Sequence, residues 1–206
     1  MASDVMNEKL RIPTSSLAIK AFTDDFNTLL SSFVDCDSTS FVAFKNCWKS
    51  MEFSNIHLSC PNKACYTNYL HTMYSVVFSM LNCPITPNST SPFSLLDDNQ
   101  QLFRWNLGVI YLLYSLFQTR LKEDHSPIRI SVESSMKLIQ IAEHYLLETG
   151  DNASKCQNAL AIIAIMLRDN VFAIAVYDGP PTTHQLSSYS SKQSVPVDNN
   201  QQTSTT

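Results

Sequence analysis

Glycine is almost absent from this chain, with three residues in 206, and this scarcity constrains the fold more than any other feature. Phosphate-cradling loops, dinucleotide-binding turns and tight hairpins need glycine, because they require positive φ angles or a close backbone approach. P-loop, Rossmann-like and kinase-like architectures are therefore disfavoured together. The chain is 44% hydrophobic, enough for one sizeable core, so a soluble, helix-rich fold is expected.

The charge balance does not favour direct binding of nucleic acid. Fourteen basic residues stand against eighteen acidic ones, for a formal net charge of -4, whereas proteins that grip DNA by themselves usually carry a basic face. The N-terminal segment lacks the apolar stretch of a signal peptide. The longest apolar run, around 107–117, is shorter than the ~20 residues that span a bilayer, so no membrane contact is expected. The expected compartment is the cytoplasm or nucleus, where the six cysteines stay reduced.

Composition divides the chain into three parts. Residues 1–21 are expected to be a flexible N-terminal segment, 22–177 a helical domain with a proline-bearing loop insertion at 84–98, and 178–206 a disordered tail rich in Ser, Thr, Gln and Asn. Inside the domain, apolar residues recur at spacings of three and four, which predicts helices. The predicted helices cover 22–34, 41–51, 64–81, 99–122, 131–147 and 152–168.

The predicted fold class is all-α, either a single multi-helix bundle or a short α-solenoid-like domain. The helix at 99–122 is hydrophobic nearly all round, so it should be central, and Gly108 within it should allow close helix approach. Ile128–Ile130 is expected to be extended. The segment 171–176 fits a strand or a short helix, and we favour a helix because a lone strand would have no partner. The helix at 131–147 should turn these residues inward: Met136, Ile139, Ala142, Tyr145 and Leu146.

No motif in the chain carries a specific chemistry. A Gly-x-Ser-x-Gly nucleophile elbow is absent, and the paired acids fit helix caps better than acid–base catalysis. His57, Cys60, Cys65 and His71 have residue types that zinc accepts, but the gap between the cysteines is too short for a hairpin and a helix. We therefore predict no metal and no cofactor, and interpret the aromatic clusters as core with some surface left for a partner.

Two segments resemble a known family. The first is FVAFKNCWKSMEF at 41–53, followed by SNI, and the second is GVIYLLYSLFQTR at 108–120, followed by PIRIS at 127–131. A weaker third match is LRDNVFAI at 167–174. Their order and their coverage of about 22–177 are similar to the N-terminal domain of the family of small nuclear RNA-activating protein complex subunit 1. The G-x-x-Y-L-L-Y-x-L string is the specific part.

The resemblance implies a non-enzymatic scaffold in a nuclear complex. That complex recognises the proximal sequence element of small nuclear RNA genes and supports transcription by RNA polymerases II and III. In the family this subunit bridges the largest subunit, which carries Myb repeats, and subunit 3. Those partners do most of the DNA reading, so promoter contact by this chain is expected to be mainly indirect, as the acidic composition also suggests.

Six residues within or beside the matching motifs are candidates for contacting a partner or supporting that contact: Trp48, Phe53, Tyr111, Tyr114, Arg120 and Arg129. The two arginines are the better interface candidates, because they follow apolar segments and can pair with acidic groups. The alternative is a helical adaptor that binds peptides or phosphoinositides. A cysteine enzyme is the third hypothesis, without local support in the sequence.

Overall fold

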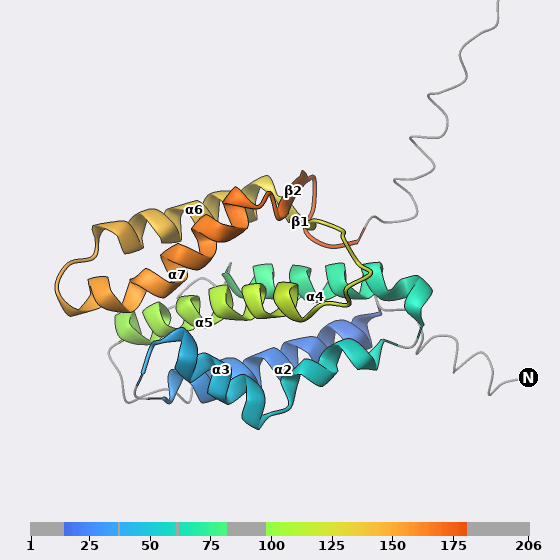
Figure 1. Cartoon of the computed structure of the whole chain (residues 1–206), viewed down its shortest axis with the longest axis horizontal. Coiled ribbons are helices and arrows are strands. Elements are labelled where there is room, and N and C mark those ends of the chain that lie inside the picture. Colours follow the sequence, from blue (N-terminus) through green and yellow to red (C-terminus); the bar gives the residue numbers. More distant parts are fainter. Residues whose placement is uncertain (1–14, 37, 61, 82–97, 181–206) are drawn as a thin grey trace, which may run out of the picture.

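The fold consists of helices arranged in three layers (Figure 1). The computed structural model describes residues 15–36, 38–60, 62–81 and 98–180. One layer holds α2 (Ser16–Val34) and α3 (Phe41–Ser50), the middle layer α4 (Tyr66–Leu81) and α5 (Asp98–Thr119), and the third layer α6 (Val132–Leu147) and α7 (Asp151–Arg168). Two short 3-10 helices, η1 (Phe53–Ser59) and η2 (Lys63–Cys65), join α3 to α4. The all-α prediction is confirmed.

Serine side chains fix where several helices begin. The Oγ of Ser15, Ser40 and Ser131 each accepts a hydrogen bond from a backbone N–H in the first turn of the helix that follows. Such a cap satisfies one of the amides that a helix start leaves unpaired. Because Ser15 caps α2, this helix begins at Ser16 and not at 22, so the predicted flexible segment 1–21 extended too far along the chain.

The core is centred on α5, as its all-round hydrophobicity predicts. Tyr111 is fully buried, and its ring packs edge-on against Phe33 of α2 at 5.8 Å between centroids. Gly108 faces the same helix, because a Cβ at this position would lie 2.9 Å from Leu30 Cδ2 and 3.0 Å from Phe33 Cδ1. The missing side chain therefore sets the close approach of α2 and α5.

The prediction of a helix at 171–176 is wrong. Residues Phe172–Ala175 form strand β2, which pairs in parallel with β1 (Ile128–Ser131) in the register Ile128↔Phe172. The partner that a strand needs is thus the extended segment predicted at Ile128–Ile130. Asn170 adopts a left-handed φ of 50°, and Val171 N–H bonds to Met166 O at 3.0 Å, which ends α7 before the strand.

The described fold also continues past 177, where the tail was predicted to begin. Asp178 accepts hydrogen bonds from the N–H and Oγ of Ser131 and from Ser134 Oγ. These bonds join the segment after β2 to the first turn of α6. The rest of the predicted tail and nearly all of the loop insertion at 84–98 lie outside the described residues.

The inward face predicted for α6 is also wrong in part. Met136, Ile139 and Leu146 are exposed, while Tyr145 is buried as expected, together with Ser134 and Leu138. The helix carries apolar residues on two sides, so spacing alone does not decide which side packs against α7, α4 and β1. The buried side is the one whose serine can bond to Asp178.

None of the helices in the part of the chain described by the structure combines the length and hydrophobicity needed to cross a bilayer.

Candidate interaction surface

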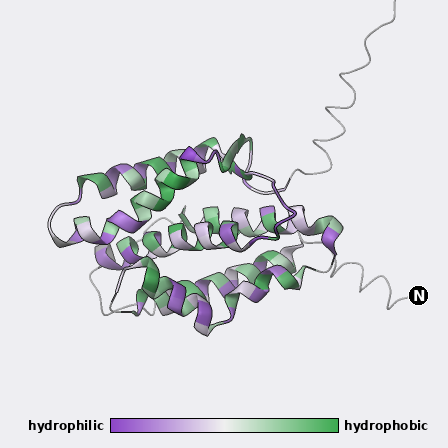
Figure 2. Ribbon diagram, in the orientation of Figure 1, coloured by the Kyte–Doolittle hydropathy of each residue, from purple (hydrophilic) through white to green (hydrophobic). Residues whose placement is uncertain are grey.

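Exposed apolar side chains gather along the outer side of α6. Val132, Met136, Ile139 and Leu146 are between 50% and 69% exposed, and Leu147 beside them is 79% exposed. Figure 2 colours much of this helix as hydrophobic although it lies at the outer edge of the fold. We call Val132, Met136, Ile139, Glu143 and Leu146 the α6 stripe. Single exposed apolar residues are ordinary, but several of them along one side of a helix are typical of a surface that another protein covers.

More exposed apolar residues occur at the end of the small sheet. Ile174, Val176 and Tyr177 are 65%, 76% and 66% exposed. Ser131 pairs with Ala175 across the sheet, so Val132 and Val176 each follow directly on one member of the same pair. The apolar surface therefore extends from α6 towards the residues after β2.

Asp178 joins the residues after β2 to the start of α6. Its carboxylate accepts from the backbone N–H of Ser131 at 2.6 Å, from Ser131 Oγ at 3.1 Å and from Ser134 Oγ at 2.6 Å. The carboxylate lies at the N-terminus of α6, where the helix dipole favours a negative charge. Strand β2 and the start of α6 are thus fixed relative to each other, so the exposed apolar residues on these two segments form a preformed surface.

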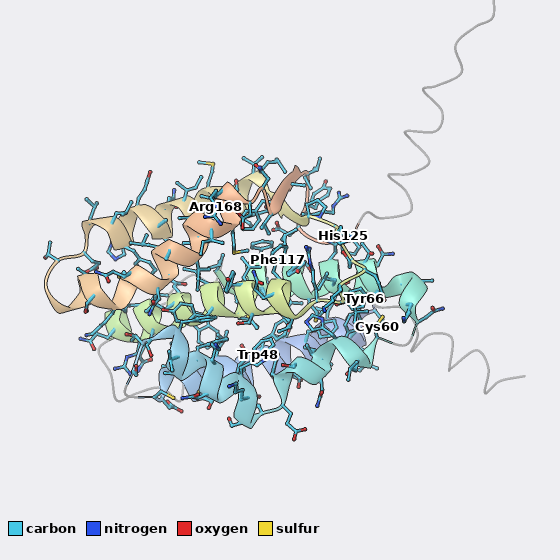
Figure 3. The ribbon with its side chains drawn as sticks, viewed as in Figure 1. Trp48, Cys60, Tyr66, Phe117, His125 and Arg168 are labelled. Atoms are coloured by element: carbon cyan, nitrogen blue, oxygen red, sulfur yellow. The ribbon has the colours of Figure 1, made fainter. Side chains whose placement is uncertain are left out.

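Three of the six sequence candidates are buried in the core. Trp48 donates from Nε1 to Ser54 Oγ at 2.8 Å and packs against Phe53, whereas Tyr111 donates to Thr39 O at 3.1 Å. Figure 3 shows Trp48 among the side chains between α3 and the middle layer. With exposures of 7% or less, Trp48, Phe53 and Tyr111 maintain the packing of α3, η1 and α5.

The other three candidates are half-buried. Tyr114 packs edge-on against Phe41. Arg120 lies over the ring of Phe117, 4.0 Å from its centroid, and donates from Nη1 to Ser126 O. Arg129 lies in β1, and its Nε is buried without a hydrogen-bond partner among the described residues. None of the six candidates belongs to the α6 stripe. Helical spacing alone assigns most of that stripe to the core, although its apolar members are exposed.

His57 does not take part in metal binding in this fold, because both ring nitrogens are already engaged. Leu121 N–H donates to Tyr66 Oη, which contacts His57 Nδ1 at 2.9 Å; His57 Nε2 lies 2.9 Å from Thr119 Oγ1. The Thr119 hydroxyl donates to Ser115 O, so it accepts from His57 Nε2–H. Burial lowers the pKa of His57 to about 4, which favours the neutral imidazole, and in that state Nδ1 accepts from the Tyr66 hydroxyl.

The remaining zinc candidates are not assembled into a site. Cys60 and Cys65 lie 3.7 Å apart at Sγ, near Tyr66 at the start of α4 (Figure 3), and burial raises the pKa of the Cys60 thiol. His71 is buried elsewhere in α4, in ring contact with Tyr74. Within the described ranges, no cluster of three or more His, Cys, Asp or Glu side chains could hold a metal ion.

A small hollow of about 230 Å³ lies between the start of α4 and the loop after α5. Tyr66, Thr67, Asp124, His125 and Ser126 are among the residues that line it. Burial raises the pKa of Asp124, but hydrogen bonds from Ser126 and Thr67 outweigh it and lower the pKa below its usual value. The carboxylate therefore holds this loop in place through the hydrogen bonds that it accepts from Thr67 and Ser126.

The comparisons with known proteins assign the family. Residues 22–206 match the model of the family described as small nuclear RNA activating complex (SNAPc), subunit 1. This chain belongs to the SNAPc subunit 1 family. A mouse (Mus musculus) relative named snRNA-activating protein complex subunit 1 is 24% identical over 119 residues, which are 58% of this chain and 26% of the relative. The match thus spans about a quarter of the length of that SNAPc subunit 1 protein.

Proposed function

We propose that this chain is a helical scaffold subunit of a small nuclear RNA-activating complex. Family membership supports this function, and the exposed apolar surface on α6 and after β2 is the observation that carries the mechanism. A subunit that joins other polypeptides needs apolar surface that is left uncovered by its own fold. The scaffold would act in the nucleus and without catalysis.

The finer part of the proposal concerns the partners. We propose that the chain bridges the largest, Myb-repeat subunit and subunit 3, in a complex that supports transcription by RNA polymerases II and III. A net charge of -4 supports an indirect relation to promoter DNA, because neutralising phosphates needs an excess of Lys and Arg. The DNA would be read by the partner subunits.

The sequence candidates have two roles in this proposal. Tyr114, Arg120 and Arg129 are proposed as a second contact region, since each keeps part of its side chain exposed. Trp48, Phe53 and Tyr111 would support partner contacts through the fold, because their side chains are buried.

Co-expression tests the function directly. The full chain should be produced with the largest subunit and subunit 3, and the tagged chain purified and analysed by size-exclusion chromatography at micromolar concentration. We expect the three proteins to elute together. Separate elution would refute the scaffold function. Flotation of the chain alone with anionic vesicles would instead support the adaptor alternative, because the scaffold is expected to remain in solution.

A further inference from the structure

The spacing of the α6 stripe matches the seam of a helix pair. Its five members, Val132 to Leu146, follow one another at intervals of four, three, four and three residues. This is the a/d heptad spacing at which two helices pack knobs into holes. The row runs along about 21 Å of helix, or two heptads, and its apolar members are at least 50% exposed.

Glu143 interrupts the apolar row near its C-terminal end. It is exposed, and among the described residues it forms no ion pair. Other ionisable side chains of α6 have partners: Lys137 pairs with Glu133 at 3.6 Å, and His144 contacts Glu148 at 3.2 Å. No cation of this helix lies three or four residues from Glu143.

Covering the stripe would remove the Glu143 carboxylate from water. Burying a carboxylate is strongly unfavourable unless a cation and hydrogen bonds compensate for the lost solvation. The occupant must therefore combine an apolar seam with a positive charge at one position. A flat apolar surface or a lipid tail would cover the apolar members but would leave the carboxylate unpaired.

A second copy of this chain does not meet that requirement. A parallel α6 pair would bring Glu143 against Glu143, and an antiparallel pair would place Glu143 opposite an apolar member of the stripe. The positions that flank the seam on α6 hold no cation, since they are Glu133, Ser135, Gln140, Ala142 and Leu147.

We propose that the α6 stripe binds one amphipathic helix of a partner subunit, with a Lys or Arg of that helix paired to Glu143. The partner helix spans about two heptads and carries its cation at a seam position. Such a residue at a seam position also fixes register and orientation. That the partner is a subunit of the same complex rests on the proposed function.

The test uses the full chain co-expressed with its two proposed partner subunits. Glu143→Lys should lower recovery of the partner by about tenfold or more, because it places two like charges together. Met136→Ser with Ile139→Ser should have a comparable effect. The matched control is Val42→Ser, which changes an exposed apolar residue of α3, 67% exposed, and should leave recovery unchanged. Circular dichroism should show the same helix content for all variants, since the changed side chains are exposed.

Photo-cross-linking then identifies the occupant. A p-benzoylphenylalanine at position 139 should label a partner helix that has a Lys or Arg at a seam position. Replacing that partner residue by Glu should then restore recovery of the partner with the Glu143→Lys chain. If the wild-type complex assembles but the α6 variants assemble equally well, this docking site is wrong and the scaffold function stands. Cross-links between two copies of the chain would also overturn the site. If the wild-type proteins do not assemble, the proposed function itself fails.

Discussion

His57 should make the stability of this protein depend on pH between about 4 and 6.5. Its ring is buried in η1 between Tyr66 and Thr119, and burial lowers its pKa from 6.5 to about 4. Between about pH 4 and 6.5, the His57 ring is largely protonated in the unfolded chain but neutral in the folded chain. The stabilisation is therefore complete above pH 6.5 and is lost as the pH falls towards 4.

The size of the effect follows from the two pKa values. The full difference corresponds to ~3 kcal/mol, and the part lost between pH 7 and pH 5 is about 2 kcal/mol. Burial also lowers the pKa of His71, with Arg129 adding to the shift, so His71 contributes in the same direction. Comparison with a chain that lacks only His57 cancels the contribution of His71.

Urea unfolding of the full chain at pH 7 and pH 5 provides the assay. We expect the wild type to lose about 2 kcal/mol more than His57→Gln or His57→Phe over this interval, whatever the stability of each variant at pH 7. Two replacements are needed because glutamine keeps polar atoms in the site and phenylalanine keeps a ring. Equal pH dependence in all three proteins would refute the neutral, buried imidazole.

Three further substitutions test the packing. Gly108→Ala should lower the unfolding free energy by about 1 kcal/mol, since crowding against buried Leu30 outweighs the gain in helix propensity; an unchanged or higher Tm would contradict this. Asp178→Ala should lower the free energy of unfolding in urea by about 2 kcal/mol, because it leaves the buried Ser134 hydroxyl without this acceptor. A loss below about 0.5 kcal/mol would show that Asp178 does not fix the segment after β2 to the start of α6. Tyr111→Phe should cost about 1 kcal/mol in the same assay but leave partner recovery unchanged, and reduced recovery would assign Tyr111 a contact role.

Several features of the fold could be predicted because they depend on near neighbours in the chain. The apolar spacing indicated the helices, and Ser131 was recognisable as a cap from the residues that follow it. The hydrophobicity around Tyr111 indicated that α5 is central, and Gly108 indicated the close helix approach that Leu30 and Phe33 make there. The end of α7 also depends on near neighbours, because Asn170 takes a left-handed conformation directly after the helix.

The α6 stripe could not be identified as a surface in the same way. Met136, Ile139 and Leu146 have helical apolar spacing, and so do the buried Leu138 and Tyr145 on the other side of the helix. Periodicity alone therefore does not show which of the two sides is buried. Glu143 within the stripe was the available sign that this side faces water, since an unpaired buried carboxylate is costly.

The sequence by itself indicated the six α-helices of the described residues and most of their boundaries, because capping and periodicity act over a few residues. It also indicated the family, because the matching motifs lie in short continuous segments. Only the tertiary structure decided the pairing of β1 with β2, the inward side of α6 and the neutral state of His57. Each of these depends on groups more than forty residues apart in the chain, such as Ser134 and Asp178 or His57 and Thr119. Their contacts exist only after folding brings those groups within bonding distance.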